Sequence, residues 1–366
     1  MAGVVFYTVP EAVLWRNERR GRDERAWRAD LPSVFDARAY SGGGIRCIAF
    51  VGAIRALERA RLRNGVRRVV GTSGGGLVAL MDAAELPAAR MEDLVMTTDF
   101  TRLCDASSWS AVEAATLLRW GGVNTGVAAT CAFGDWVHRV TGLSRDATFD
   151  DLARAHPDVE LAIVATSLAT LRPLVFSMRT GHAQTPLRIA LRASASIPYF
   201  FAPVTASRDG KVVDTLVDGG LVDNLPVHAF CAPEEHGDDD QDADDANGHC
   251  CRNTLAFLLD ALATAAPPSP MAEANTVYSD GLAVSHAAFA AANADAAWLQ
   301  MTRGCLRGVP LRRVVSVPPP GDIATAQFAL CDAQRRRLLD IGDSACSAYL
   351  VGLGALEQAA PSSLDC

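Results

Sequence analysis

Two segments of this 366-residue chain share one layout, in which an apolar stretch runs into a cluster of glycines and then into a helical pattern. Residues 34–40 (VFDARAY) lead into residues 42–44 (GGG), and residues 66–70 (VRRVV) lead into residues 71–76 (GTSGGG). Apolar residues recur at helical spacing in the stretches that follow. Because glycine permits a tight turn between a strand and a helix, both segments predict a strand–turn–helix unit.

The rest of the chain repeats this alternation of strands and helices. Helical patterns run from about residue 88 to 156, with a glycine break at 121–122, and again over residues 187–196 and 325–358. Thr148, with Asp151 three residues later, is typical of a helix N-cap. The alternation predicts an α/β fold with a central sheet covered on both faces. The other predicted strands are residues 159–170, 173–178, 211–217, 253–259 and 312–317.

The acidity of the chain is concentrated in one segment. The formal net charge is −8, and residues 232–250 alone contribute −8, from two Glu and six Asp with no Lys or Arg. The remainder is near neutral, which argues against a nucleic-acid-binding protein. We expect residues 231–250 to form a disordered acidic loop, residues 1–32 an N-terminal arm, and residues 251–366 a part that completes or caps the sheet.

Neither a signal peptide nor a transmembrane helix is predicted. Pro10, Glu11 and Arg16 interrupt the N-terminal apolar stretch, and no apolar run reaches about 18 residues. Ten cysteines without a CxxC pair are typical neither of a zinc site nor of a disulfide framework. We therefore expect a cytoplasmic or membrane-peripheral protein that needs no metal and no cofactor.

Residues 71–75 form a G-x-S-x-G sequence centred on Ser73. Small residues on both sides of a serine allow a sharp strand-to-helix turn that presents the hydroxyl to a substrate. The helix that follows directs its free N–H groups and the positive end of its dipole at the same point, where they stabilise an oxyanion. Ser73 is therefore the candidate nucleophile, with Gly71, Gly74 and Gly75 as supporting residues.

Gly42, Gly43 and Gly44 form the second candidate feature. Consecutive glycines let backbone N–H groups turn inward and hold an anion. One interpretation is an oxyanion hole supported by Arg46. The other is a nucleotide-phosphate site, which is weakly supported because Cys47 stands where a G-x-G-x-x-G motif requires its last glycine, and no GK[ST] sequence is present.

Asp218 ends a predicted strand and precedes Gly219 and Gly220. A carboxylate at this point can act as a base toward Ser73, because partial burial raises its pKa. Taken alone, the segment fits better a turn aspartate that satisfies the backbone of its own loop.

Taken together and in this order, the segments GGGIR, GTSGG and DGG resemble the patatin-like phospholipase family. Residues 194–204 (SASIPYFFAPV) and 221–227 (LVDNLPV) also resemble the family's sequence around its aspartate. The resemblance covers about residues 34–230. It implies a patatin-like three-layer α/β/α fold with a central, mostly parallel sheet, and a catalytic domain at residues 33–230.

The resemblance also implies a Ser-Asp dyad in place of a triad. Ser73 would attack the carbonyl of a fatty-acyl ester, and Asp218 would accept its proton and later activate water. Family members cleave acyl chains from phospholipids or neutral lipids, so the expected partner is a lipid, met through peripheral membrane contact; an activator protein is unknown. Ser41 and Cys47 stand where the family commonly has Asp and Gly.

Two other functions remain open from the residues alone. An α/β-hydrolase-type esterase would need a histidine after Asp218, and the candidates are His228, His236, His249 and His286. A non-catalytic lipid-binding protein of the same fold is the third interpretation, which the presence of both Ser73 and Asp218 disfavours.

A group of large apolar residues follows the candidate nucleophile in the chain. They predict either core packing or an interfacial patch that meets an aggregated substrate. The group consists of Phe100, Trp109, Leu117, Leu118 and Trp120.

Overall fold

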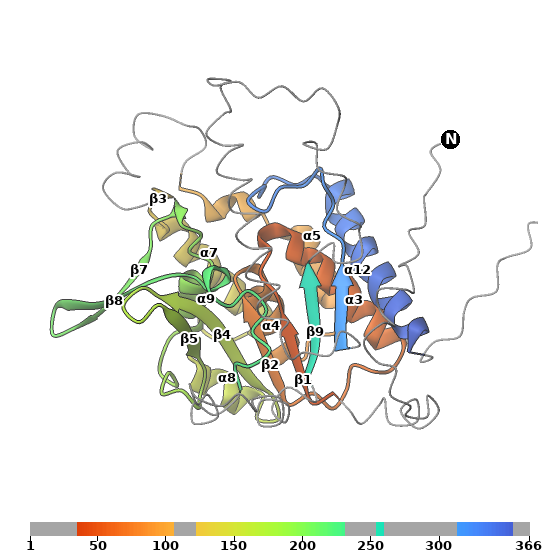
Figure 1. The fold of residues 1–366 in the computed structure, drawn as a ribbon, viewed down its shortest axis with the longest axis horizontal. Coiled ribbons are helices and arrows are strands. Elements are labelled where there is room, and N and C mark those ends of the chain that lie inside the picture. Colours follow the sequence, from red (N-terminus) through yellow and green to blue (C-terminus); the bar gives the residue numbers. More distant parts are fainter. Residues whose placement is uncertain (1–34, 106–121, 231–253, 260–312, 354–366) are drawn as a thin grey trace, which may run out of the picture.

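The structure is a computed structural model that describes residues 35–105, 122–230, 254–259 and 313–353. Its centre is an eight-stranded sheet with the order β10-β9-β1-β2-β4-β8-β7, in which β5 also pairs with β4 (Figure 1). The five strands from β10 to β4 are parallel to one another, whereas β5, β7 and β8 join by antiparallel pairing. The parallel strands are β1 (Ala37–Tyr40), β2 (Arg68–Thr72), β4 (Glu160–Ser167), β9 (Thr254–Leu259) and β10 (Val314–Val317), and the others are β5 (Arg172–Phe176), β7 (Val204–Arg208) and β8 (Lys211–Asp218).

The helices pack against this sheet through one large hydrophobic core. Strand residues alternate between two faces, as a pleated sheet requires. Tyr40 and Phe257 stack in the large core with their ring centroids 5.0 Å apart, whereas Ala39 and Ala256 face a smaller core on the other side. The α-helices are α3 (Ile48–Arg59), α4 (Gly74–Ala83), α5 (Ala88–Thr97), α7 (Val127–Thr141), α8 (Phe149–Ala155), α9 (Leu187–Ser194) and α12 (Asp332–Gly352), and the short 3-10 helices are η2 (Gly44–Cys47), η3 (Phe100–Leu103) and η4 (Gly219–Leu221).

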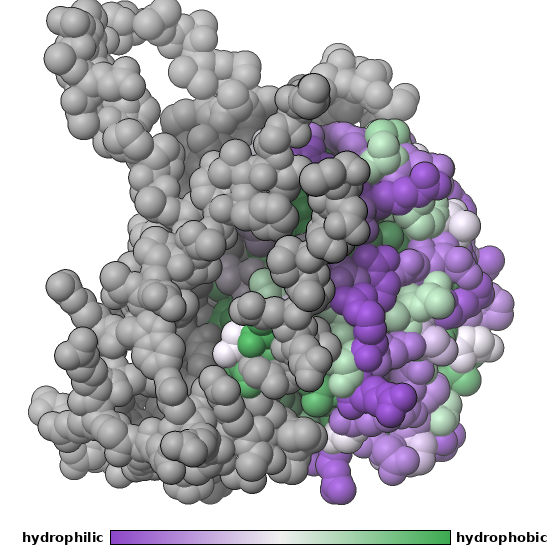
Figure 2. Space-filling model, turned by 90° about the vertical axis from the view of Figure 1, so that its right-hand side faces the viewer, coloured by the Kyte–Doolittle hydropathy of each residue, from purple (hydrophilic) through white to green (hydrophobic). Residues whose placement is uncertain are grey.

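Helix α12 lies along α3 at the edge of the molecule (Figure 1). The two backbones meet at glycines, since a Cβ on Gly52 would lie 1.8 Å from the Leu339 carbonyl oxygen. Arg55 and Arg59 of α3 form ion pairs with Asp343 of α12. Figure 2 views the molecule from this side and shows hydrophilic residues over most of the described surface.

These features confirm the α/β fold with a central, largely parallel sheet. Strands β9 and β10, which follow residue 251, belong to that sheet. In the described ranges the smaller core is covered by Leu225 and Val227 of the segment after η4. The predicted N-terminal arm and acidic loop lie outside the described residues.

Of two local predictions from the sequence, one is confirmed and the other is wrong in part. Thr148 and Asp151 form the expected capping box, with each side chain accepting the other's backbone N–H. The expectation of a helical region from 88 to 156 was wrong at one point, where β3 (Gly122–Asn124) pairs in parallel with β6 (Tyr199–Phe201). The strand forms because residues 122–124 lie against a distant segment of the chain: a Cβ on Gly122 would lie 2.2 Å from the Phe201 backbone.

Among the described helices, none is long and apolar enough to cross a membrane.

Candidate active site

Ser73 occupies a strained turn between β2 and α4. Its φ of 53° and ψ of −126° lie in a region that residues with a side chain rarely adopt, and such a conformation persists only when its surroundings hold it. Its backbone N–H donates to Ser194 Oγ at 2.8 Å, and that hydroxyl in turn donates to the Val164 carbonyl. A Cβ on Gly71 would lie 2.3 Å from the Gly75 carbonyl oxygen, so the turn closes only because both flanking positions are small.

The hydroxyl of Ser73 donates a hydrogen bond to Oδ2 of Asp218 at 2.7 Å. Asp218 is the last residue of β8, which runs antiparallel to β4 and places it opposite Ala165. The other carboxylate oxygen, Oδ1, accepts the N–H of Gly220 at 2.8 Å. Ser73 and Asp218, 145 positions apart in sequence, therefore meet in one buried site, where they are 2% and 1% exposed.

Burial raises the pKa of Asp218 to about 7, because the carboxylate loses its hydration and no cation among the described residues forms an ion pair with it. The hydrogen bonds from Ser73 and Gly220 lower the pKa and offset only part of that effect. A carboxyl group with a pKa near neutrality is a stronger base than an exposed aspartate, and it is suited to take a proton from a hydroxyl.

The glycine turn after β1 lies directly beside this pair. A Cβ on Gly42 would lie 3.3 Å from Ser73 Cβ, and one on Gly74 would lie 2.3 Å from the Gly44 carbonyl oxygen. The N–H of Gly42 donates to the Asn224 carbonyl at 3.0 Å, so it has an acceptor other than a substrate oxyanion. The N–H groups of Gly43 and Gly44 have no hydrogen-bond acceptor in the described part of the chain.

The segment between β10 and α12 packs against the same turn and holds it in place. Gly44 has a φ of +57°, and a Cβ there would lie 2.1 Å from the Thr325 carbonyl oxygen, so only glycine fits. Ile45 N–H donates to that same carbonyl at 3.0 Å, and Arg46 Nε donates to the Ile323 carbonyl at 2.6 Å. Arg46 therefore braces the turn without a hydrogen bond to Ser73 or Asp218.

The two departures from the family pattern have local partners. Ser41 Oγ accepts the N–H of Leu259 at 3.1 Å, which ties the end of β1 to the end of β9. The Cys47 thiol donates to the Ser41 carbonyl at 3.5 Å, and burial raises its pKa well above the usual thiol range, so it stays protonated. Both residues therefore contribute a hydrogen bond at the glycine turn.

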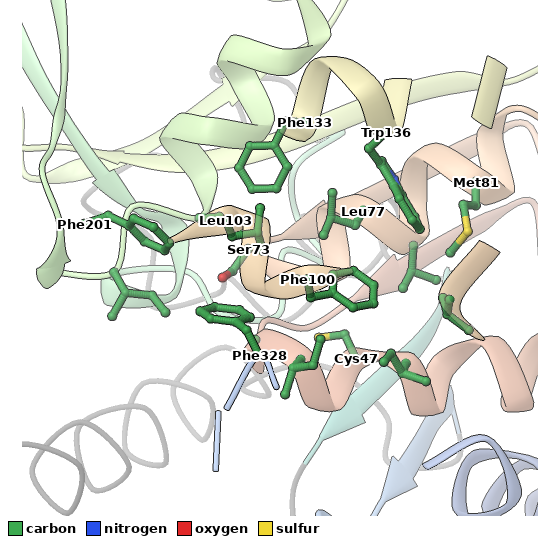
Figure 3. Close-up of a pocket in the computed structure, with 18 residues that line it drawn as sticks. Cys47, Ser73, Leu77, Met81, Phe100, Leu103, Phe133, Trp136, Phe201 and Phe328 are labelled. Carbon is green, nitrogen blue, oxygen red and sulfur yellow. The ribbon is translucent and has the colours of Figure 1, made fainter. Parts of the chain in front are cut away.

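An apolar pocket opens beside Ser73 and extends between α3, α4 and α7 (Figure 3). The cavity has a volume of about 50 Å³, which becomes about 590 Å³ when the open solvent space at its mouth is included. Figure 3 shows the Ser73 hydroxyl near Phe201 and Phe328, with Met81 at the far end of the view. A buried apolar slot next to a hydroxyl is suited to an alkyl chain whose reacting group stops at the serine. Its lining includes Ile48, Leu77, Met81, Phe100, Phe133 and Trp136.

The structure also bears on the alternatives drawn from the sequence. Within the described ranges, both oxygens of Asp218 are bonded to Ser73 and Gly220, and no histidine forms a hydrogen bond with either Ser73 or Asp218. Phe100 lines the pocket and is 6% exposed, as core packing predicts. Among the described residues, no group of three or more His, Cys, Asp or Glu could hold a metal ion. The residues of these alternatives that lie outside the described ranges are Trp109, Leu117, Leu118, Trp120, His236, His249 and His286.

Sequence reasoning missed several contributors to the site. Ser194 carried a weak signal, since it begins the segment that resembles the family's sequence before its aspartate. Phe133, Trp136 and Phe328 carried none, because an aromatic residue at helical spacing or in a loop is ordinary core material. Gly219 is tightly packed, since a Cβ there would lie 2.2 Å from the Val164 carbonyl oxygen.

A family model described as patatin-like phospholipase matches residues 39–231, just over half of the chain. The chain belongs to the patatin-like phospholipase family. The match confirms the resemblance seen in the three glycine-containing motifs. It ends before β9, β10 and the segment with Ile323, Thr325 and Phe328, so a part of the chain beyond the matched region helps to build the site.

Individual proteins also resemble this chain, one in sequence and two in structure. The uncharacterized protein YqhO of Bacillus subtilis is 29% identical over 199 residues, which cover 52% of this chain and 65% of YqhO. VipD of Legionella pneumophila has a similar fold, with a TM-score of 0.50 and 17% identity over 87% of this chain and 67% of VipD. ExoU of Pseudomonas aeruginosa, solved in complex with SpcU, has a TM-score of 0.43 and 15% identity over 87% of this chain and 53% of its own. The chain thus spans about two thirds of YqhO and VipD and about half of ExoU.

Proposed function

We propose that this protein is a lipid acyl hydrolase that cleaves fatty-acyl esters through a Ser73–Asp218 dyad. The observation that carries the proposal is the 2.7 Å hydrogen bond from the Ser73 hydroxyl to a buried carboxylate, at the mouth of an apolar pocket. Membership of the patatin-like phospholipase family supports a lipid ester as the substrate. Phospholipids and neutral lipids are the classes to test first.

In the first half of the reaction, Ser73 Oγ attacks the ester carbonyl carbon while its proton passes to Asp218 Oδ2. The carbon–oxygen double bond opens to a tetrahedral oxyanion, which then collapses and breaks the bond to the alcohol. Asp218 returns the proton to the departing alcohol oxygen. The acyl chain remains esterified to Ser73.

In the second half, water attacks the acyl-enzyme and gives its proton to Asp218. Collapse of the second tetrahedral oxyanion breaks the bond to Ser73 Oγ, which recovers its proton from Asp218. The products are a fatty acid and an alcohol or lysolipid. Each half-reaction uses one carboxylate as base and then as acid, and the dyad needs no histidine.

The oxyanion is stabilised by backbone N–H groups at the ends of two glycine turns. Gly43 and Gly44 provide donors without another acceptor in the described chain, whereas Gly42 is already bonded to Asn224. Helix α4 begins at Gly74, next to the nucleophile, and the positive end of its dipole further stabilises the oxyanion. Loss of one such donor costs about 3 kcal/mol in transition-state stabilisation.

The test is an assay of the wild type, Ser73→Ala and Asp218→Asn against phospholipids, lysophospholipids, triacylglycerols and short p-nitrophenyl esters. Ser177→Ala is the matched control, because Ser177 is equally buried and its Oγ forms a hydrogen bond with the Arg179 N–H, away from the site. We expect wild type and Ser177→Ala to release fatty acid and both dyad variants to lose it. Equal activity in Ser73→Ala and wild type would refute the proposal.

A further inference from the structure

Trp136 lines the otherwise apolar pocket, and its indole ring carries a hydrogen-bond donor. The residue lies on α7, is 4% exposed and lines the cavity together with Phe100 and Phe133. Its indole Nε1 is buried and has no hydrogen-bond partner among the described residues. The ring packs against Phe100 with centroids 6.1 Å apart, a contact that leaves the N–H unsatisfied.

A donor of this kind calls for a physical explanation. Buried indole N–H groups usually have an acceptor. A buried N–H without one has lost its hydrogen bond to water and has gained no other in its place. A trapped water is a poor substitute, since a buried water needs two to four polar partners and the neighbouring lining residues Leu77, Met81 and Phe133 are apolar. Phenylalanine would fill a purely hydrocarbon slot without that penalty.

Helix α4 gives the distance between Ser73 and the indole of Trp136. Ser73 precedes the helix, and Leu77 and Met81 follow at one and two turns, so at 1.5 Å per residue they lie roughly 6 and 12 Å along the axis. All three line the pocket, and in Figure 3 the Trp136 ring stands over the stretch from Leu77 to Met81. An alkyl chain esterified to Ser73 would pass the indole several carbons from its carbonyl.

We propose that the pocket is built for an acyl chain that carries an oxygen acceptor part-way along its length, which accepts a hydrogen bond from Trp136 Nε1. A ketone, epoxide or hydroxyl oxygen meets this requirement, and an unsubstituted chain leaves the indole unpaired. The inference rests on the proposed function for the placement of the chain, and it narrows the substrate class from acyl esters in general to esters of oxygenated fatty acids.

The first experiment measures binding and does not depend on turnover. The ¹H–¹⁵N spectrum of Ser73→Ala, with the Trp136 indole resonance assigned through Trp136→Phe, is recorded with methyl dodecanoate and with its mono-keto analogues. We expect the indole proton to move downfield only with the keto esters, and most for one ketone position in the middle of the chain. The same shift with the plain ester, or with a ketone at every position, would overturn the inference.

The second experiment measures specificity as a ratio. For wild type, kcat/KM for the best keto ester should exceed that for the plain ester by about 10-fold, the size of one hydrogen bond formed in a buried site. In Trp136→Phe the ratio should fall to about one. Phe133→Leu, which changes the same pocket without touching a donor, is the control and should keep the ratio.

The outcomes separate the two proposals. If all esters are hydrolysed with a ratio near one in wild type, the oxygenated-chain inference fails while the lipid acyl hydrolase stands. If no ester is hydrolysed but the indole still responds to one ketone position, the hydrolase proposal fails and the ligand class stands.

Discussion

Asp82 and Asp218 are both buried near the two ends of helix α4, yet their surroundings give them opposite chemistry. Asp82 lies near the carboxyl end of the helix, where Arg38 binds both of its oxygens at 2.6 and 2.9 Å and Tyr40 donates to it at 2.8 Å. Asp218 lies beside Ser73 at the amino end, where its partners are a hydroxyl and a backbone N–H.

Burial acts in the same direction on both carboxyl groups, and the neighbours decide the result. For Asp82, burial raises the pKa, but the charges of Arg38 and Arg63 and the hydrogen bonds to it outweigh that effect and hold the pKa below its usual value. For Asp218, the donors among the described residues are the neutral groups of Ser73 and Gly220, and the pKa rises to about 7. A paired buried aspartate is a permanent anion that holds the fold together, whereas one without a cation can exchange a proton during a reaction.

The largest expected effect is on activity and separates the two residues. Asp218→Asn removes the proposed base and should lower kcat for any accepted ester by about 10³-fold, since general acid–base catalysis contributes 10² to 10⁴. Steady-state assays on purified, folded protein measure it. A variant that keeps even a tenth of the wild-type kcat would show that Asp218 is not the base.

The second expectation concerns stability, where the two substitutions should act with opposite signs. Asp82→Asn leaves the buried Arg38 guanidinium without its counter-charge and should destabilise the fold by about 3–5 kcal/mol. Asp218→Asn removes a carboxylate that is unfavourable to bury and should stabilise the fold at pH 8, by up to about 4 kcal/mol. Urea unfolding monitored by circular dichroism gives both values. If both variants lose stability to a similar extent, the contrast between the two sites is wrong.

The third expectation is the pH dependence of that stabilisation. The pKa of Asp218 is higher in the folded than in the unfolded chain, so the folded state holds the proton more tightly. Wild-type stability relative to Asp218→Asn is therefore complete below the ordinary aspartate pKa of about 4 and is lost as pH rises to about 7. Thermal unfolding of the two proteins from pH 4 to 8 should show Tm curves that diverge with rising pH. Parallel curves would exclude a raised pKa.

The smallest expected effect is at Ser194, which holds the strained backbone of Ser73. Ser194→Ala leaves the Ser73 N–H without its acceptor and should lower kcat by about 10-fold with little change in KM, because the proposed nucleophile is misplaced while the pocket is intact. Ser177→Ala is again the control, since its Oγ accepts a backbone N–H elsewhere. An equal drop in both variants would indicate a general loss of stability.

The same contrast explains what the sequence could predict. The turns around Gly44, Ser73 and Asp218 were identified because each is a local strand–glycine signal, and because their order resembles one family. The pairing of β3 with β6 and the diversion of the Gly42 N–H to Asn224 were not predicted. Both depend on contacts between segments far apart in the chain. A local sequence pattern does not indicate which distant segment will pack against it.

The roles of individual buried residues show the same limit. Asp82 and Trp136 look like ordinary helix residues in the sequence, and only the fold brings Arg38 to the first and leaves the second without an acceptor. The segment with Thr325 and Phe328 carried no motif at all, although it supports the glycine turn and lines the pocket.

The most direct test of the dyad is the reaction of the folded protein with a fluorophosphonate probe, followed by mass spectrometry as a function of pH. The serine oxygen forms a bond to phosphorus, fluoride leaves, and the hydroxyl proton passes to the base, so no substrate need be known. We predict one label, on Ser73, with a rate that rises through about pH 7 as Asp218 ionises and that collapses in Asp218→Asn. Labelling at another residue, or at Ser73 at an unchanged rate in Asp218→Asn, would contradict the account.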